Sequence, residues 1–111
     1  MSALYIMRYL GADGVSFGSI YIGKGIFTGV DVANGRYNGT YTEAGGQMTG
    51  QGVLSAPPGG ATLVTGDVLP EGQTTPLQMN WPANFADGSP QSVSIMGNNV
   101  QVTFEKVGDI P

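Results

Sequence analysis

The chain contains no cysteine and no histidine, and both absences narrow its chemistry. Without cysteine it has no disulfide, no thiolate nucleophile and no sulfur metal ligand, which fits a reducing compartment. Histidine is the commonest metal ligand and a frequent general base near neutral pH. Its absence argues against a metal or haem site and against a catalytic triad. We therefore expect a protein that is not an enzyme and that uses no cofactor or metal.

Charged side chains are also scarce, with four basic and eight acidic residues among 111 and a net charge of −4. The basic residues stand singly along the chain, at Arg8, Lys24, Arg36 and Lys106. Proteins that bind nucleic acids usually carry a basic patch or stripe. We therefore expect no nucleic-acid partner.

Long apolar runs are missing as well. No stretch approaches the roughly 20 apolar residues of a membrane-spanning helix. The first apolar segment is interrupted by Arg8 and lacks the basic start of a signal peptide. We expect no membrane association and a cytoplasmic location. Apolar residues also fail to recur at helical spacing over three turns without a glycine or proline between them.

Glycine, by contrast, is abundant, with 19 residues distributed among many Val, Ile, Tyr and Phe. Glycine at short intervals inside β-prone runs is typical of tight turns, bulges and strongly bent strands. Gly18 is expected to form a bulge where the apolar face of its strand changes. The expected strands cover residues 3–10, 15–22, 26–32, 36–43, 47–54, 61–69, 75–81, 91–96 and 100–106.

The most informative stretch is residues 26–41, IFTGVDVANGRYNGTY. The dipeptide Asn34-Gly35 predicts a two-residue hairpin turn between two strands. Asp31 follows Gly29 and lies three residues before Asn34, so we expect it to cap the hairpin or to pair with Arg36. Gly29, Asp31, Asn34 and Gly35 are therefore interpreted as structural residues.

Short strands with regularly spaced turns predict an all-β antiparallel meander. A single open sheet of this length would expose two edges and an apolar face, so it should close into a barrel or fold into a sandwich. The short turns between sequential strands favour an up-and-down β-barrel of about eight strands. We expect it to form one domain over residues 1–111.

Five aromatic side chains are candidates for the interior of such a barrel: Phe17, Tyr37, Tyr41, Trp81 and Phe104. Barrels of about eight strands either fill their interior with side chains or leave room for one small ligand. In a chain this short, packing is favoured. A carrier of a small apolar or aromatic ligand is the alternative function.

Other motifs favour no enzyme. The segment GSIYIGKG, residues 18–25, lacks both the hydroxyl residue and the following helix of a phosphate-binding loop. Acid–base catalysis would need two carboxylates that converge in a cleft. Solvated positions and turns are the ordinary use of such acids, which are Asp31, Glu43, Asp67, Glu71 and Glu105.

Several segments carry a family resemblance: FGSIYIGKG at 17–25, TGVD at 28–31, YNGTY at 37–41 and VTFEK at 102–106. With these segments the chain resembles the GrlR-like family, small bacterial barrels related in shape to lipocalins. The type member is a negative regulator of type III secretion. The family commonly has Gly-Gly-Asp where this chain has Gly29-Val30-Asp31.

The resemblance implies a lipocalin-like barrel, a tendency to form a homodimer and no catalysis. The family regulator contacts its partner through an acidic turn. The corresponding turn here, residues 43–46, has Glu43 as its single acid, so that contact is not carried over. We expect a non-enzymatic barrel that acts through protein–protein interaction, as a homodimer and a negative regulator.

Overall fold

The computed structural model describes residues 2–11, 14–63, 66 and 68–111. Within these ranges the chain forms ten strands and no helix. The strands are β1 Ser2–Gly11, β2 Gly14–Gly23, β3 Ile26–Asp31, β4 Arg36–Ala44, β5 Gln47–Ser55, β6 Ala61–Thr62, β7 Val68–Leu69, β8 Thr74–Pro82, β9 Gln91–Ile95 and β10 Asn98–Asp109.

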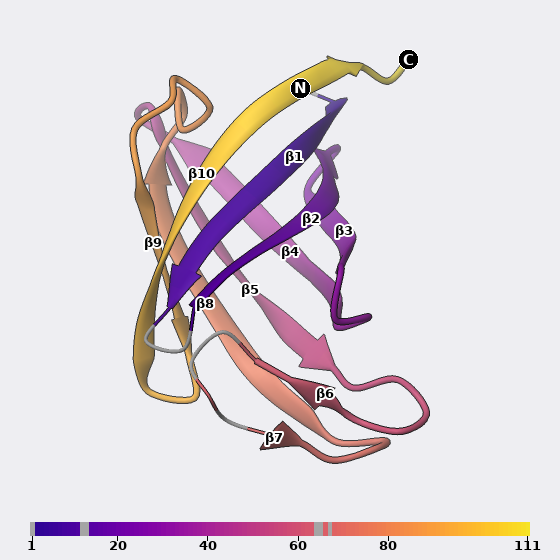
Figure 1. Cartoon of the computed structure of the whole chain (residues 1–111). Helices are drawn as coiled ribbons and strands as arrows, with labels where there is room; N and C mark the ends of the chain where they lie inside the picture. The colour runs from indigo at the N-terminus through magenta and orange to yellow at the C-terminus, as the bar shows by residue number, and fades with distance from the viewer. Residues whose placement is uncertain (1, 12–13, 64–65, 67) are drawn as a thin grey trace.

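Eight of these strands form a closed barrel in the order β1-β10-β9-β8-β5-β4-β3-β2 (Figure 1). Each neighbouring pair is antiparallel. Strand β1 pairs with β2 on one side and with β10 on the other, so the first and last strands lie side by side. The expectation of an all-β, antiparallel up-and-down barrel of about eight strands is confirmed.

Side chains alternate between the interior and the solvent, as the period of a β-strand requires. In β8, Leu77, Met79 and Trp81 are buried, whereas Gln78 and Asn80 are exposed. This alternation agrees with the sequence prediction for residues 75–81. The inward residues of the barrel strands together form one apolar core.

Strand β2 differs from the prediction at Gly18. Its register with β1 runs without a shift from Ser2–Gly23 to Gly11–Gly14, so Gly18 forms no bulge. The even-numbered residues of β2 face inward throughout, including Ser16 and Ile20. A Cβ atom on Gly18 would lie 3.0 Å from Cε of Met7 and 2.8 Å from the carbonyl oxygen of Val30. Glycine occupies this position because neighbouring atoms fill the space.

The central hairpin also differs from the prediction, because its loop is longer than the two residues Asn34-Gly35. The Asn34 N–H donates to the carbonyl oxygen of Asp31 at 2.9 Å, and the Asp31 N–H donates to that of Gly35 at 3.0 Å. Asn34 has a φ of 68°. These bonds define a three-residue loop, a type I turn followed by a left-handed residue. The Gly35 N–H donates to Oδ1 of Asp31 at 2.8 Å, so the aspartate side chain caps this longer loop.

The last hairpin turns earlier than predicted. Met96 and Gly97, with φ of 51° and 78°, are its two central residues, and Ile95 pairs with Asn98. The predicted strands 91–96 and 100–106 imply a turn at residues 97–99, and this placement is wrong because Asn98 and Asn99 already belong to β10. Strand β10 also continues to Asp109, past the predicted end at residue 106.

The two ends of the barrel are covered by different segments. The single strand predicted over residues 61–69 is wrong: β6 and β7 form a separate two-stranded sheet, and residues 64, 65 and 67 lie outside the described part. Leu69, which belongs to this sheet, and Leu63, which directly follows β6, are buried in the core. At the other end, the irregular segment 83–90 inserts Phe85, which is 1% exposed.

Inward-facing glycines on β4 and β5 make room for the ring of Phe27. Gly39 lies opposite Phe27 on β3 and opposite Gly52 on β5. A Cβ atom on Gly52 would lie 2.8 Å from Cζ of Phe27, and one on Gly39 would overlap the same ring. Phe27 is only 2% exposed because these glycines let the ring lie against the sheet.

We predict that Gly39→Ala destabilises the barrel. The added methyl group would overlap the Phe27 ring and the carbonyl oxygen of Gln51, and overpacking of this kind lowers the free energy of unfolding by about 1–3 kcal/mol. Urea unfolding measures the change. The matched control is Gly108→Ala, because nothing lies within 4 Å of its added Cβ, and its effect should stay below about 0.5 kcal/mol. Equal stabilities of the two variants would contradict the packing argument.

Candidate functional site

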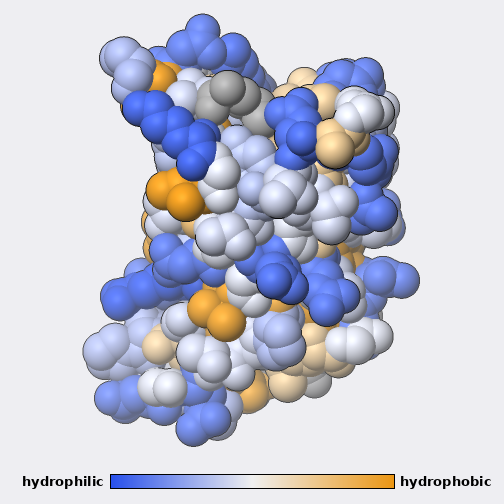
Figure 2. Space-filling model, turned by 180° about the vertical axis from the view of Figure 1, so that it is seen from behind, coloured by the Kyte–Doolittle hydropathy of each residue, from blue (hydrophilic) through white to orange (hydrophobic). Residues whose placement is uncertain are grey.

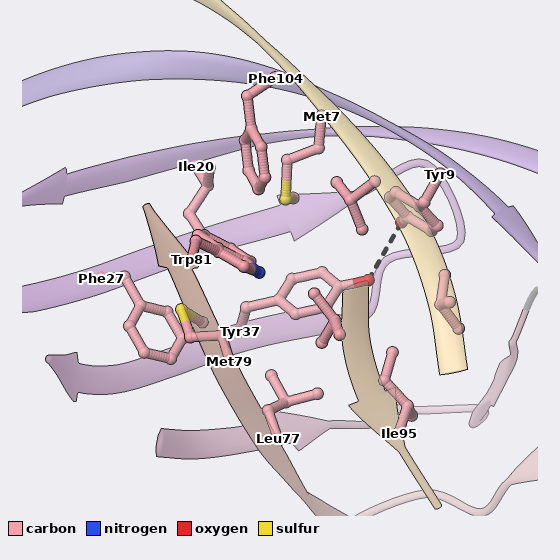
Figure 3. A pocket seen from close by; sticks show the side chains of 13 residues that line it. Met7, Tyr9, Ile20, Phe27, Tyr37, Leu77, Met79, Trp81, Ile95 and Phe104 are labelled. Atoms are coloured by element: carbon pink, nitrogen blue, oxygen red, sulfur yellow. Dashed lines mark hydrogen bonds between the residues drawn. The ribbon is translucent and has the colours of Figure 1, made fainter. Parts of the chain in front are cut away.

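Three of the five predicted interior aromatic residues lie in the lumen: Tyr37, Trp81 and Phe104 are buried and point inward (Figure 3). Tyr41 is half-buried and packs against the core. Phe17, by contrast, is 47% exposed, so its place in the interior set is wrong. It lies opposite Arg8 in the ladder with β1, and both side chains are exposed.

The lumen is filled by side chains. Trp81 and Phe104 have ring centroids 4.8 Å apart, and Phe85 packs on both at 5.5 Å and 5.2 Å. A cavity of about 20 Å³ lies beside Tyr9, Asp31 and Tyr37, and the cavity among the apolar core side chains has a volume of about 30 Å³ and an almost entirely apolar lining. This volume holds one or two water molecules, whereas sites for drug-sized ligands measure about 300–1,000 Å³. A carried ligand would therefore have to displace core side chains.

The polar feature of the lumen is a cluster of one carboxylate and two phenols. The Tyr37 hydroxyl donates to Oδ2 of Asp31 at 2.5 Å. The hydroxyls of Tyr37 and Tyr9 are hydrogen-bonded at 3.0 Å (Figure 3). All three residues are buried, and Oδ1 of Asp31 accepts the Gly35 N–H. The cluster thus ties β1 and β4 to the loop of the central hairpin.

The sequence singled out Asp31 and Tyr37 but not their connection to Tyr9. Asp31 holds the hairpin loop, one of the two roles expected for it. Arg36 is exposed, whereas Asp31 is buried and engaged with Gly35 and Tyr37. Tyr9 shares the inward face of β1 with Tyr5 and Met7. The alternation of these residues along the strand is the sequence signal that could have placed Tyr9 in the lumen. Gly29 is structural in a different sense, because a Cβ there would lie 3.0 Å from Cα of Ile20.

The electrostatics of this cluster favour neutral phenols. Burial raises the pKa of Tyr9 and of Tyr37 above the ordinary value of a phenol. The neighbouring Asp31 carboxylate raises both pKa values further, because a phenolate would form beside a negative charge. The cluster is therefore suited to holding structure together, since neither phenol is prepared to release its proton near neutral pH.

The outer surface carries a second feature that sequence reasoning missed. Exposed apolar side chains gather on neighbouring strands, where Leu10 lies opposite Val15, and the Val32 N–H donates to the carbonyl oxygen of Phe17 at 2.9 Å. Val32 is 74% exposed and Val15 is 64% exposed. We call this surface the outer patch. It consists of Leu10, Val15, Phe17, Val30 and Val32.

The acidic residues form no evident metal or catalytic site within the described part of the chain. Among the residues that the structure describes, no three acidic side chains gather as metal ligands. Glu43, Glu71 and Glu105 are exposed, and Asp67 lies outside the described residues. Arg8 and Glu105 form an exposed ion pair at 3.4 Å, an interaction of small energetic value. Within the described ranges, no helix is long and apolar enough to cross a membrane.

Comparison with known proteins adds no identification: no family model matches the chain, and no curated protein matches it.

We predict that the stability of the barrel falls above about pH 10. The unfolded chain then releases its phenol protons, whereas Tyr9 and Tyr37 keep theirs in the folded state because their pKa values are raised. The native state therefore binds more protons, so the free energy of unfolding decreases as the pH rises. Below that pH both states are protonated and the contribution is fully present.

Urea unfolding at several pH values between about 8 and 11.5 measures this slope. Tyr37→Phe removes one buried phenol and should make the slope shallower. At pH 7 the same substitution should cost about 1–3 kcal/mol, because Oδ2 of Asp31 loses a donor. A Tyr37→Phe protein with an unchanged slope would show that the phenol is not held neutral.

Proposed function

We propose that this protein is a non-enzymatic binding domain that recognises a protein partner through the outer patch. The observation that carries the proposal is the exposure of Leu10, Val15, Phe17, Val30 and Val32 on adjoining strands. Contiguous exposed apolar surface on a soluble domain often marks an interaction site. The small lumen supports the same choice, because it leaves the exterior as the place where a partner can bind.

The residues around the outer patch favour a particular kind of partner. Arg8 lies opposite Phe17, and Arg36 lies opposite Val30, so two of the four basic residues border the apolar surface. A partner that presents apolar side chains beside carboxylates complements this arrangement. Arg8 already pairs with Glu105 at 3.4 Å, so a partner's carboxylate would share Arg8 with Glu105 and would meet Arg36 directly. We propose a different protein as the occupant of this surface.

The family resemblance adds a biological setting to this proposal. A GrlR-like barrel acts by binding its protein partner. A regulator of this type needs a binding surface and no catalytic group. A chain without cysteine suits the reducing cytoplasm, where we place it. The proposed protein also forms a homodimer, which would use a surface other than the outer patch.

We predict that Phe17→Thr/Val32→Thr weakens partner capture. Threonine keeps the branched shape and β-propensity of valine while removing apolar surface. Tagged protein incubated with an extract of the source cells should retain a partner at defined stoichiometry, and the double variant should bind it at least about tenfold more weakly. Cross-linking followed by mass spectrometry should place the contact on β1–β3.

The matched control is Val68→Thr/Val107→Thr, since these valines are 65% and 58% exposed and lie outside the patch. It should capture the partner as the unchanged protein does. Analytical ultracentrifugation of the three proteins reports on homodimer formation. Recovery of no partner at any stoichiometry, or equal capture by both double variants, would refute the proposed surface.

A further inference from the structure

The contact between β8 and β9 is the shortest ladder among the described strands of the barrel wall (Figure 1). It consists of three residue pairs, from Leu77–Ile95 to Met79–Val93. Every other neighbouring pair of barrel strands has at least five. We call this contact the β8–β9 seam. Since the pairs of a ladder carry its backbone hydrogen bonds, fewer such bonds hold the seam than any other part of the wall.

The sequence limits the seam at both ends. Pro76, the residue before the first pair, has no N–H to donate, and Met96 already belongs to the last hairpin turn. At the other end, the indole N–H of Trp81 donates to the carbonyl oxygen of Ser92 at 2.9 Å. Strand β8 then ends, and the segment 83–90 leads to β9. The ladder therefore cannot be extended at its first end, and a side-chain bond follows it at the other.

The apolar cavity of about 30 Å³ lies directly behind the seam (Figure 3). Leu77 and Met79 of β8 line it, and so do Val93 and Ile95 of β9. Met79 has a flexible thioether side chain that adapts to changes in the space around it. A separation of β8 from β9 would therefore join this cavity to the solvent.

The two ends of the barrel, by contrast, are filled by apolar side chains. Phe85 is 1% exposed at one end, and Leu63 and Leu69 are buried at the other. The outer side of the seam is polar, because Gln78 lies opposite Ser94 and both are exposed. Most of the surface seen from behind is likewise blue or white, with isolated orange (Figure 2). Water thus reaches the outside of the seam, and the short ladder separates it from the lumen.

We propose that the β8–β9 seam is a lateral gate, which opens locally and connects the lumen with the solvent while the rest of the barrel stays folded. The three ladder pairs and the bond from Trp81 to Ser92 break together. The nine pairs between β5 and β8 and the five pairs between β9 and β10 persist. Local opening of a segment held by few backbone bonds requires less free energy than global unfolding.

The gate is separate from the outer patch. Strand β10 lies between β9 and β1, and strands β4 and β5 lie between β8 and β3. Opening of the seam therefore leaves the pairing of β1, β2 and β3 intact. For this reason the gate does not depend on the protein partner proposed for the patch.

Trp81 links the two strands of the gate and also reports on their separation. It is the single tryptophan of the chain and is 1% exposed. Its ring packs on Phe104 at 4.8 Å and on Phe85 at 5.5 Å, measured between ring centroids. When β9 moves away from β8, the indole N–H loses its acceptor on Ser92 and becomes open to exchange with water.

Hydrogen exchange of the Trp81 indole N–H, followed by NMR, tests the proposal. A gate that opens locally should give this proton a protection factor at least about tenfold below that of the most protected backbone amides, which exchange through global unfolding. Acrylamide quenching of the Trp81 fluorescence gives a second readout of the same opening. Both measurements on the unchanged protein need no substitution.

The test variant is Gln78→Cys/Ser94→Cys, which places a disulfide across the seam in a chain without other cysteines. Directly opposite residues of an antiparallel pair have Cα atoms about 4.5–5.5 Å apart, a separation that a disulfide spans. Oxidation should slow the indole exchange at least about tenfold and lower the acrylamide quenching constant. A thiol reductant should restore both.

The matched control is Thr42→Cys/Thr49→Cys, which bridges β4 and β5 at an exposed and directly opposite pair. Its oxidation should leave the indole exchange unchanged, because this bridge does not cross the seam. The proposal is overturned if the indole N–H is as protected as the slowest amides, or if both disulfides slow its exchange equally. Exchange that is unaffected by the seam disulfide would also overturn it, since Trp81 would then move without the strands.

Discussion

The barrel depends on the fit of the Phe27 ring onto the paired glycines Gly39 and Gly52. An eight-stranded barrel has an interior just wide enough for side chains. The Phe27 ring fits because both strands beside it offer no side chain at the facing positions. Trp81, Phe85 and Phe104 occupy most of the remaining space. Since the lumen is used for packing, the accessible surface of the barrel is on its outside.

Features set by local periodicity could be predicted from the sequence. The alternation of Leu77, Met79 and Trp81 with polar residues identified both the strand and its buried face. The same argument failed for Phe17, because β2 has apolar residues on both faces and its orientation is decided by pairing with β1. Adjacent residues cannot report which face is buried when both faces are apolar.

The turns show the same distinction between local and non-local control. Lys24-Gly25 and Gly45-Gly46 adopt positive φ at both central positions and form the short turns that their glycines predict. Asn34-Gly35 has the stronger dipeptide signal, yet its hairpin has a three-residue loop in which the Asp31 carboxylate accepts the Gly35 N–H. The burial of Asp31 beside Tyr37 is a non-local feature that the dipeptide alone does not report.

The candidate site was predictable only in part for a related reason. Asp31 and Tyr37 lie close in the sequence, whereas Tyr9 reaches Tyr37 across the lumen from a distant strand. The outer patch also depends on pairing between strands. Leu10 lies opposite Val15 because β1 pairs with β2, and Val32 lies beside Phe17 because the chain after β3 returns along β2.

The pairing of β1 with β10 has a kinetic consequence. Ala3 lies opposite Asp109, and the Ile110 N–H donates to the carbonyl oxygen of Ser2 at 2.8 Å. Strand β1 can therefore pair with β10 only after β10 has been synthesised. Contacts of such long sequence separation also form slowly. Until β10 has left the ribosome, β1 and β9 each keep one unpaired edge. Because free strand edges pair readily with other chains, this interval before closure is when the nascent protein most needs protection from aggregation.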